Sequence, residues 1–237
     1  MSPWRAVSTD VVHVWLIGAQ VPEPVLARLH AVLDDGERQR AEALLHAQDR
    51  RRFVIAHGAV RVIVGARLGV PAERIRWQLG RNGKPELAAE WTGVRVSLSH
   101  SGDLSMVAIT DERDVGVDVQ QLLPSLDATG MAARFFPPAE ARFVAAGTGP
   151  AEAADRFGRL WTRKEACIKA SGGRLMQGMT LPVYGTGRIV VVDHPDGALP
   201  GPYVVTDVPV PQGFAASVAL EGAQPYRMVP RWWSWDE

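Results

Sequence analysis

The chain has 237 residues, of which 46% are hydrophobic and 22% are charged, values typical of a globular protein with a substantial core. This length suits one large domain or two small ones. Lysine and arginine together number 26, as do aspartate and glutamate, so the net charge is zero. Because non-specific binding to nucleic acid requires a basic excess, this balance argues against nucleic acid as a partner.

The first half of the chain is predicted to form one strand, three helices and then a series of short strands. The longest helix is expected over 49–68, with Asp49 as its cap. Its spacing predicts a buried stripe made of Phe53, Ala56, Val60, Ile63 and Val64. The predicted strands are 11–17, 74–79, 94–99, 105–110 and 115–119, and the other helices are 24–33 and 37–46.

The second half repeats this order, with helices first and strands after them. The segment 104–109 loosely resembles 215–220, so we expect two similar α+β lobes, 1–112 and 113–237. The second lobe ends in a tryptophan-rich tail, Arg231–Trp235, expected to pack against the body, with a partner-binding patch as the alternative. The predicted elements are helices 128–135, 138–146 and 151–171 and strands 188–192, 203–207 and 214–220.

The sequence shows no sign of secretion or of membrane insertion. Its one cysteine, Cys167, allows no intramolecular disulfide, which suits a reducing cytoplasm. The start, Met1–Arg5, has no apolar signal-peptide segment, and no apolar run approaches membrane-spanning length. We therefore expect a cytoplasmic protein without a membrane partner.

The helix around Trp161–Lys169 carries charge where a core-facing stripe should be apolar. Lys164 falls in the middle of the face that holds Phe157 and Ile168. A lysine there either extends its amine to solvent or pairs with an anion. Glu165 and Lys169, four residues apart, lie along the edge of that face. The alternatives are a solvent-reaching lysine beside a surface ion pair, or a functional site.

A second acidic position lies on the strand predicted over 115–119. Asp118 and Gln120 alternate with apolar residues and therefore point to the same face of a strand. Either this strand is half exposed with two polar positions outward, or the two side chains share a cation. Asp118 and Glu165 together supply two hard oxygen ligands, a set that suits Mg²⁺.

Other candidate centres are weaker. Ser99 and His100 are neighbours on a strand and face opposite sides, so they form no nucleophile–base pair; His100 either donates to a phosphate or stabilises a turn. Lys84 follows the turn Asn82-Gly83. Cys167 is interpreted as a small helix residue rather than a nucleophile. The histidines show no zinc spacing, and no phosphate-loop glycine pattern is present.

Four segments, in this order and spacing, resemble the 4'-phosphopantetheinyl transferases of the Sfp type. They are Gly83-Lys84-Pro85, Ser97–Ser101, Gly116-Val117-Asp118 and Trp161–Lys169. The resemblance runs from residue 38 to 181. Its Trp-x-x-Lys-Glu-Ala form is similar to the branch that serves polyketide and non-ribosomal peptide assembly lines, and use in fatty-acid synthesis is also open.

The resemblance implies an α+β fold with two lobes in a pseudo-twofold arrangement and coenzyme A bound between them. Asp118 and Glu165 would hold Mg²⁺ on the pyrophosphate. Gln120 stands where many members carry an acid, so the amide or water would complete the metal sphere. Lys169 would contact the transferred phosphate, with Lys164 near it. In the family, several residues bind the nucleotide phosphates. The matching positions in this chain are Arg40, Arg52, Lys84 and His100, with Ser99 beside them.

The implied activity is that of a holo-[acyl-carrier-protein] synthase type transferase. It would move 4'-phosphopantetheine from coenzyme A to a serine of an apo acyl or peptidyl carrier protein and release 3',5'-ADP. Glu165, Lys169 and Asp118 would be catalytic, with Glu165 as the general base, directly or through a metal-bound water. Carrier recognition is expected on 122–138, and a monomer suffices. The alternatives are a degenerate homologue that only binds coenzyme A or a carrier, and a coenzyme A-dependent acyltransferase, for which no thioester-reactive centre is visible.

Overall fold

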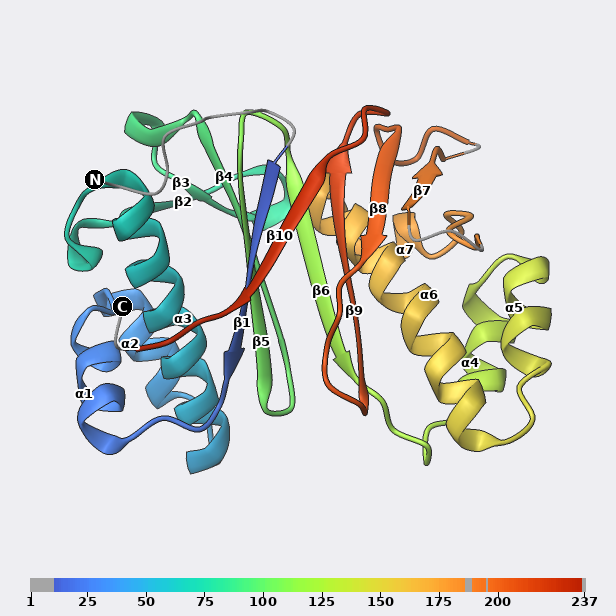
Figure 1. Ribbon diagram of the computed structural model, residues 1–237, viewed down its shortest axis with the longest axis horizontal. Helices are drawn as coiled ribbons and strands as arrows, with labels where there is room; N and C mark the ends of the chain where they lie inside the picture. The colour runs from blue at the N-terminus through green and yellow to red at the C-terminus, as the bar shows by residue number, and fades with distance from the viewer. Residues whose placement is uncertain (1–10, 186–188, 195, 236–237) are drawn as a thin grey trace.

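The computed structural model describes residues 11–185, 189–194 and 196–235 (Figure 1). The elements of the first half are β1 (Val11–Gly18), α1 (Glu23–Ala31), α2 (Asp35–Glu42), α3 (Ala47–Leu68), β2 (Trp77–Leu79), β3 (Pro85–Leu87), β4 (Val94–Ser101) and β5 (Leu104–Asp111). They are followed by β6 (Val115–Gln121), α4 (Ala128–Phe135), α5 (Pro138–Ala145), α6 (Pro150–Ser171), α7 (Leu175–Gly178), β7 (Ile189–Val192), β8 (Tyr203–Asp207), β9 (Phe214–Glu221) and β10 (Arg227–Trp232). The fold is therefore of the mixed α+β class.

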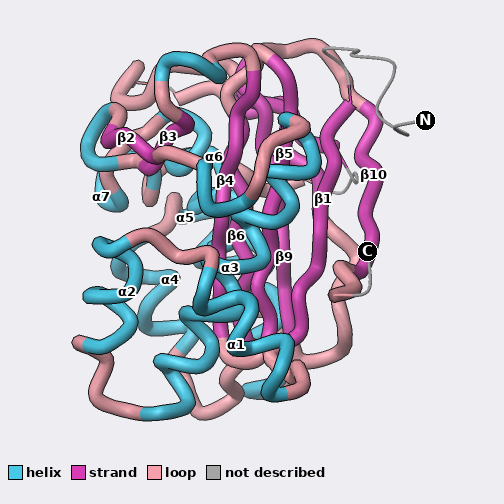
Figure 2. The backbone as a smooth tube through the Cα atoms, turned by 90° about the vertical axis from the view of Figure 1, so that its left-hand side faces the viewer, coloured by secondary structure: helices cyan, strands magenta, loops and turns pink. Residues whose placement is uncertain are grey.

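Two four-stranded sheets form the centre of the molecule, with helices on their outer sides (Figure 1). The first sheet has the order β10-β1-β5-β4 and the second the order β6-β9-β8-β7. All pairings are antiparallel except that of β1 with β10. Strands β2 and β3 form a separate hairpin, which lies at the same end of the molecule as α7 (Figure 2). No described helix is both long and apolar enough to cross a membrane.

Inner strands such as β1 and β5 are buried on two faces, and the structure has three apolar cores. On β1, Val12 and Val14 face the core shared by the two sheets, whereas Trp15 and Ile17 face the core under α3. This follows from the alternation of side chains along a strand. A third core lies between α6 and the second sheet and contains Phe157. Near-continuous apolar runs such as 104–109 reflect burial on both faces.

The close approach of α6 to β6 depends on Gly116. A Cβ built on Gly116 would lie 2.0 Å from the carbonyl oxygen of Ala166 and 2.3 Å from the backbone nitrogen of Ala170. Only a residue without a side chain lets the helix backbone rest directly on the strand. Because Asp118 lies two residues along the same strand, this contact brings it beside the last turns of α6.

Several predicted boundaries need correction. Helix α3 begins at Ala47 with His46 at its cap position, so Asp49 lies inside the first turn rather than at the cap. Phe53 is only half buried and stacks on His57, with ring centroids 3.9 Å apart. Only the last three residues of the strand predicted over 74–79 are extended. Arg188, the predicted start of a later strand, lies outside the described residues, as does Met1–Arg5.

The end of the chain returns to the first sheet. Residues 227–232, assigned by the sequence analysis to the second lobe, form β10 and pair in parallel with β1, Val11 opposite Arg227 and Leu16 opposite Trp232. Trp233 then packs against the first core, and its backbone nitrogen donates to the carbonyl of Leu16 at 2.8 Å. A division at 112/113 therefore does not separate the two sheets.

Candidate functional site

Helix α6 presents the central charged residues of the site. Pro150 occupies its first turn, and Gly172 ends it in the left-handed region with φ 60°, the usual preferences for these positions. Within it, Glu165 and Lys169 are half buried at the edge that faces β6, whereas Lys164 is fully buried. Glu165 and Lys169 are therefore accessible charges of this helix, whereas the charge of Lys164 is enclosed.

The anionic partner of Lys164 is a carboxylate of the protein. Its Nζ lies 2.6 Å from Oε2 of Glu140 and donates to the carbonyl of Leu181. Glu140 also accepts hydrogen bonds from the backbone nitrogens of Val183 at 2.6 Å and Tyr184 at 2.9 Å. Burial lowers the pKa of Lys164, and the charge of Glu140 opposes that shift. The amine of Lys164 is thus enclosed in the core with Glu140 as its anionic partner, and its position beside a bound phosphate stays a prediction.

Asp118, Ser99 and Lys169 form a closed group of hydrogen bonds where β4, β6 and α6 meet. Oδ1 of Asp118 accepts from Oγ of Ser99 at 2.8 Å and from Nζ of Lys169 at 2.7 Å. Nζ of Lys169 also lies 2.9 Å from Oγ of Ser99. The Asp118 side chain is buried, which raises its pKa, while the neighbouring Lys169 amine lowers it.

The second oxygen of Asp118 and the carboxylate of Glu165 accept no hydrogen bond from the described residues. Oδ2 of Asp118 is buried and has no hydrogen-bond partner among the described residues. Burial raises the pKa of Glu165, and the negative charge of Asp118 raises it further. Within the described chain no ion pair joins Glu165 to Lys169, so the interpretation as an ordinary surface pair is wrong. The two carboxylates repel each other, and a divalent cation bound between them would reduce that repulsion.

The donor set fits Mg²⁺ better than a metal that needs several protein ligands. In the described part of the chain no group of three or more His, Cys, Asp or Glu residues can hold a metal ion. Asp118 and Glu165 supply two carboxylates, and Mg²⁺ usually takes one or two, with phosphate and water oxygens completing its sphere. Gln120 lies on the same face of β6 as Asp118, half exposed, and its amide nitrogen donates to the carbonyl of Gln121 at 3.1 Å.

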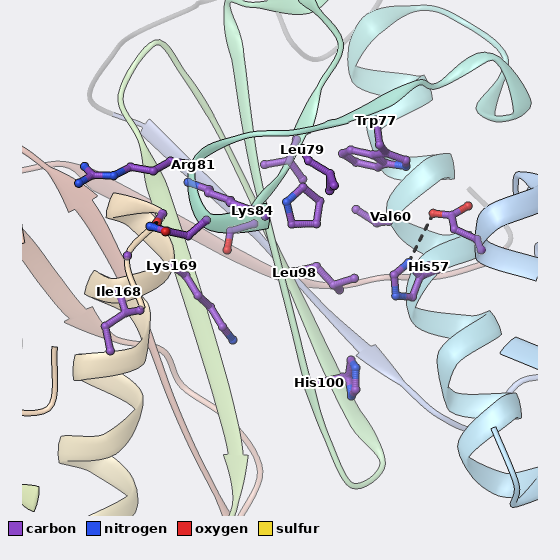
Figure 3. A pocket seen from close by; sticks show the side chains of 18 of the residues that line it. His57, Val60, Trp77, Leu79, Arg81, Lys84, Leu98, His100, Ile168 and Lys169 are labelled. Atoms are coloured by element: carbon purple, nitrogen blue, oxygen red, sulfur yellow. Dashed lines mark hydrogen bonds and ion pairs between the residues drawn. The ribbon is translucent and has the colours of Figure 1, made fainter. Parts of the chain in front are cut away.

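A cleft of about 440 Å³ opens directly beside this group. Its walls come from α2, α3, the β2–β3 hairpin, β4 and the end of α6 (Figure 3). Lys169 points into it from α6, and His100 and Leu98 approach it from β4, with His57 on the opposite wall (Figure 3). Lys169 therefore belongs both to the carboxylate group and to the cleft, and it connects the two.

Three further predicted phosphate ligands line the cleft: Arg40, Lys84 and His100. Nζ of Lys84 donates to the carbonyls of Ala170 at 3.0 Å and Val115 at 3.3 Å, and burial lowers its pKa. Desolvation within the cleft lowers the pKa of His100, and the charges of His57 and Lys169 add to that shift. The cleft therefore gathers cationic and hydrogen-bonding groups suited to an anionic ligand.

Two predicted ligands lie away from the cleft surface. Nε and Nη2 of Arg52 donate to Asp103 at 2.9 and 2.8 Å, and Nη1 lies 3.2 Å from Asp49. The hydrogen bond to Asp103 raises the pKa of Arg52. Ser99 is buried and turned toward Asp118. Neither Arg52 nor Ser99 is among the described residues that line the cleft.

Sequence reasoning missed a link between the hairpin and α6. Nδ2 of Asn82 donates to the carbonyl of Gly172 at 2.7 Å, and Oδ1 accepts from Nε of Arg174 at 3.3 Å. Asn82 has φ 51°, as expected from an Asn-Gly turn, but the turn alone does not reveal a partner 90 residues away. Cys167 is fully buried, and burial raises its pKa far above the ordinary value, so it is no nucleophile.

A sequence model of the 4'-phosphopantetheinyl transferase superfamily matches residues 114–199. The 4'-phosphopantetheinyl transferase HetI of Nostoc sp. is 36% identical over 167 residues, which cover 69% of this chain and 70% of HetI. A 4'-phosphopantetheinyl transferase of Bacillus subtilis is 27% identical over 172 residues, 71% of this chain and 73% of the relative. A third relative, from Bacillus pumilus, is 32% identical over 145 residues, which cover 61% of this chain and 60% of the relative.

Proposed function

The chain belongs to the family of 4'-phosphopantetheinyl transferases, and on that premise we propose that its cleft binds coenzyme A and that Asp118, Glu165 and Lys169 carry out the transfer. The product is a carrier protein that bears 4'-phosphopantetheine on a serine. The observation that carries the proposal is the position of Lys169, whose Nζ lies 2.7 Å from Oδ1 of the buried Asp118 and which also lines the cleft.

The reaction exchanges one phosphorus–oxygen bond for another. The carrier serine oxygen forms a bond to the β-phosphorus of coenzyme A, and the bond to the bridging oxygen of the pyrophosphate breaks. The leaving group is 3',5'-ADP, and the serine proton passes to a base. Such transfers need little covalent help from the protein and depend on positioning and on stabilisation of charge.

Glu165 is our choice for the base. Its raised pKa, caused by burial and by Asp118, makes it a better proton acceptor than an exposed glutamate. Lys169 lies at the boundary of the cleft, where it can donate to an oxygen of the transferred phosphate; a donor so placed is worth roughly 10²-fold or more in rate. Bound Mg²⁺, held by Asp118 and Glu165 with Gln120 or water, would neutralise charge on the pyrophosphate.

Arg40, Lys84 and His100 are proposed to hold the other phosphates of coenzyme A. All three line the cleft, where each can donate a hydrogen bond to a phosphate oxygen. For Lys84, binding a phosphate would replace hydrogen bonds to the two backbone carbonyls that it contacts. We assign carrier recognition to 122–138, where Leu123 and Leu126 are exposed large apolar residues.

We further infer a pseudo-twofold relation between the two halves of the fold. Strand β1 pairs with β5, which pairs with β4; in the same way β6 pairs with β9, the last strand before β10, and β9 pairs with β8. The similar segments 104–109 and 215–220 lie in the two corresponding strands β5 and β9, which supports the relation. We also propose a cytoplasmic monomer of the holo-[acyl-carrier-protein] synthase type, acting without nucleic acid or membrane.

Mass spectrometry tests the activity. The protein is incubated with coenzyme A, Mg²⁺ and an apo carrier domain, and the carrier is weighed. A gain of one phosphopantetheine group supports transfer. An unchanged carrier mass despite tight binding of coenzyme A would instead identify a degenerate binding protein, and an acyl-sized gain from acyl-coenzyme A would identify an acyltransferase.

A further inference from the structure

The facing edges of the two sheets are joined by serine side chains. Ser97, Ser99 and Ser101 occupy every second position of β4 and therefore share one face. Their hydroxyl oxygens accept hydrogen bonds from the backbone nitrogens of β6: from Val117 at 3.1 Å, from Val119 at 3.3 Å and from Gln121 at 3.0 Å. We call these three bonds the serine seam; Figure 1 shows β4 and β6 side by side.

The serine seam provides hydrogen-bond acceptors for backbone N–H groups at the edge of β6. Strand β6 lies at one edge of the second sheet. Every other backbone N–H of β6 therefore points away from β9, the strand with which it pairs. Such groups remain unpaired unless another acceptor reaches them. The serine hydroxyls provide that acceptor, and β4 and β6 stay in separate sheets. The spacing of the serines thus fixes the register of one sheet edge against the other.

Ser99 differs from the other two serines of the seam. A hydroxyl has two lone pairs and one proton. Here the oxygen accepts from the backbone of Val119 and from Nζ of Lys169, so its single proton is left for Oδ1 of Asp118. Two donors therefore occupy Oδ1, and Oδ2 has no partner among the described residues.

We propose that Ser99 is a positioning residue, which sets the carboxylate of Asp118 so that Oδ2 is free to bind the metal and which holds Lys169 at the cleft. This rests on the proposed function, because it assumes that Asp118 binds a metal during transfer. It also assigns to Ser99 a role other than contact with a nucleotide phosphate. The first sheet thereby orients a ligand carried by the second.

Removing the hydroxyl releases both neighbours. In Ser99→Ala, Asp118 is the one hydrogen-bond partner that Lys169 retains among the described residues, and the carboxylate can rotate so that either oxygen faces the amine. Residues that orient metal ligands typically contribute 10–100-fold to metal affinity. We therefore expect Ser99→Ala to weaken metal binding by roughly tenfold or more and to raise the Mg²⁺ concentration at half-maximal rate by a similar factor.

The chain offers a matched control in the same seam. Ser97→Ala removes one equivalent bond, to the backbone of Val117, but no bond to a carboxylate or to Lys169. Ser99→Thr keeps a hydroxyl and serves as the rescue. If Ser99→Ala is too unstable to purify, Ser99→Cys replaces it, because a thiol fills the space and is only a weak donor. Thermal unfolding reports the contribution of each bond to stability.

The deciding measurement is binding of Mn²⁺ by electron paramagnetic resonance, in the presence of coenzyme A and without a carrier. We expect weaker Mn²⁺ binding in Ser99→Ala, binding within about twofold of the wild type in Ser97→Ala, and recovery in Ser99→Thr. Equal losses in the two alanine variants, or no loss in Ser99→Ala, would overturn the proposal. Failure of the proposed function is separate: the wild type would then bind Mn²⁺ with the expected serine dependence but leave the carrier mass unchanged.

Discussion

Replacing Gly116 by alanine is expected to move Glu165 and Lys169 on α6 away from Asp118 on β6. The added Cβ would lie 2.0 Å from the carbonyl oxygen of Ala166, 2.3 Å from the nitrogen of Ala170 and 2.9 Å from the carbonyl carbon of Lys169. All three are backbone atoms, so no side-chain rotation relieves the contact. The last turns of α6, which carry Glu165, must move away from β6 by about 1 Å or more.

The magnitude follows from this displacement. Overpacking of this kind costs about 1–3 kcal/mol, and for a chain of this size each kcal/mol lowers Tm by roughly 2–4 °C. A shift of about 1 Å between groups that must act together can cost roughly 10²-fold in rate. We therefore expect folded Gly116→Ala protein with a modestly lower Tm and a far lower kcat.

The control is another strand glycine. A Cβ on Gly18 meets nothing within 4 Å, so Gly18→Ala is expected to leave kcat unchanged and to keep or slightly raise Tm. Both variants are assayed for transfer to an apo carrier and for thermal unfolding. If Gly116→Ala retained the Tm and kcat of the wild type, the close packing of α6 on β6 would not be what positions the site.

Three further variants test other parts of the structure. Lys164→Met should destabilise the fold by about 3–5 kcal/mol, because it leaves Glu140 buried without its partner; in urea unfolding, Lys164→Met combined with Glu140→Gln should recover most of the loss, and no recovery would contradict the pairing. Burial alone would raise the pKa of Glu37, but hydrogen bonds from His57 and the backbone of Asp34 and the Arg61 guanidinium lower it below the ordinary 4.5. Its contribution to stability is therefore present above about pH 4.5 and is lost as pH falls through the folded value, so the stability gap between wild type and Glu37→Gln should narrow on acidification, and a constant gap would refute this. Asn82→Gly keeps the positive φ but removes the bond to α6, for an expected loss of about 1 kcal/mol in urea unfolding; unchanged stability would contradict the link.

Local patterns predicted the elements that local physics determines. Helix α6 was predicted over 151–171 and spans Pro150–Ser171, since proline at its start and glycine after its end mark the boundaries. The first strand was predicted over 11–17 and spans Val11–Gly18. In contrast, β10 pairs with β1 across more than 200 residues, and no local period carries that information.

The candidate site shows the same division. The alternation of Asp118 and Gln120 and the placement of Glu165 and Lys169 at the helix edge were visible as patterns. The ion pair between Asp118 and Lys169 and the one between Lys164 and Glu140 were not, because tertiary packing selects such partners. The serine seam was predictable only in part. The alternation of its serines is visible in the sequence, but their role as acceptors appears only when β6 is placed beside β4.

The assignment of Glu165 as the base is tested most directly by the rate of 3',5'-ADP release. Wild type, Glu165→Gln and Asp155→Asn are compared with coenzyme A, Mg²⁺ and an apo carrier under single-turnover conditions. Asp155 is an exposed acid on the same helix and serves as the control. We predict that Glu165→Gln, folded and able to bind coenzyme A, loses roughly 10²-fold or more in rate while Asp155→Asn matches the wild type. Near-normal turnover by folded Glu165→Gln would contradict the assignment.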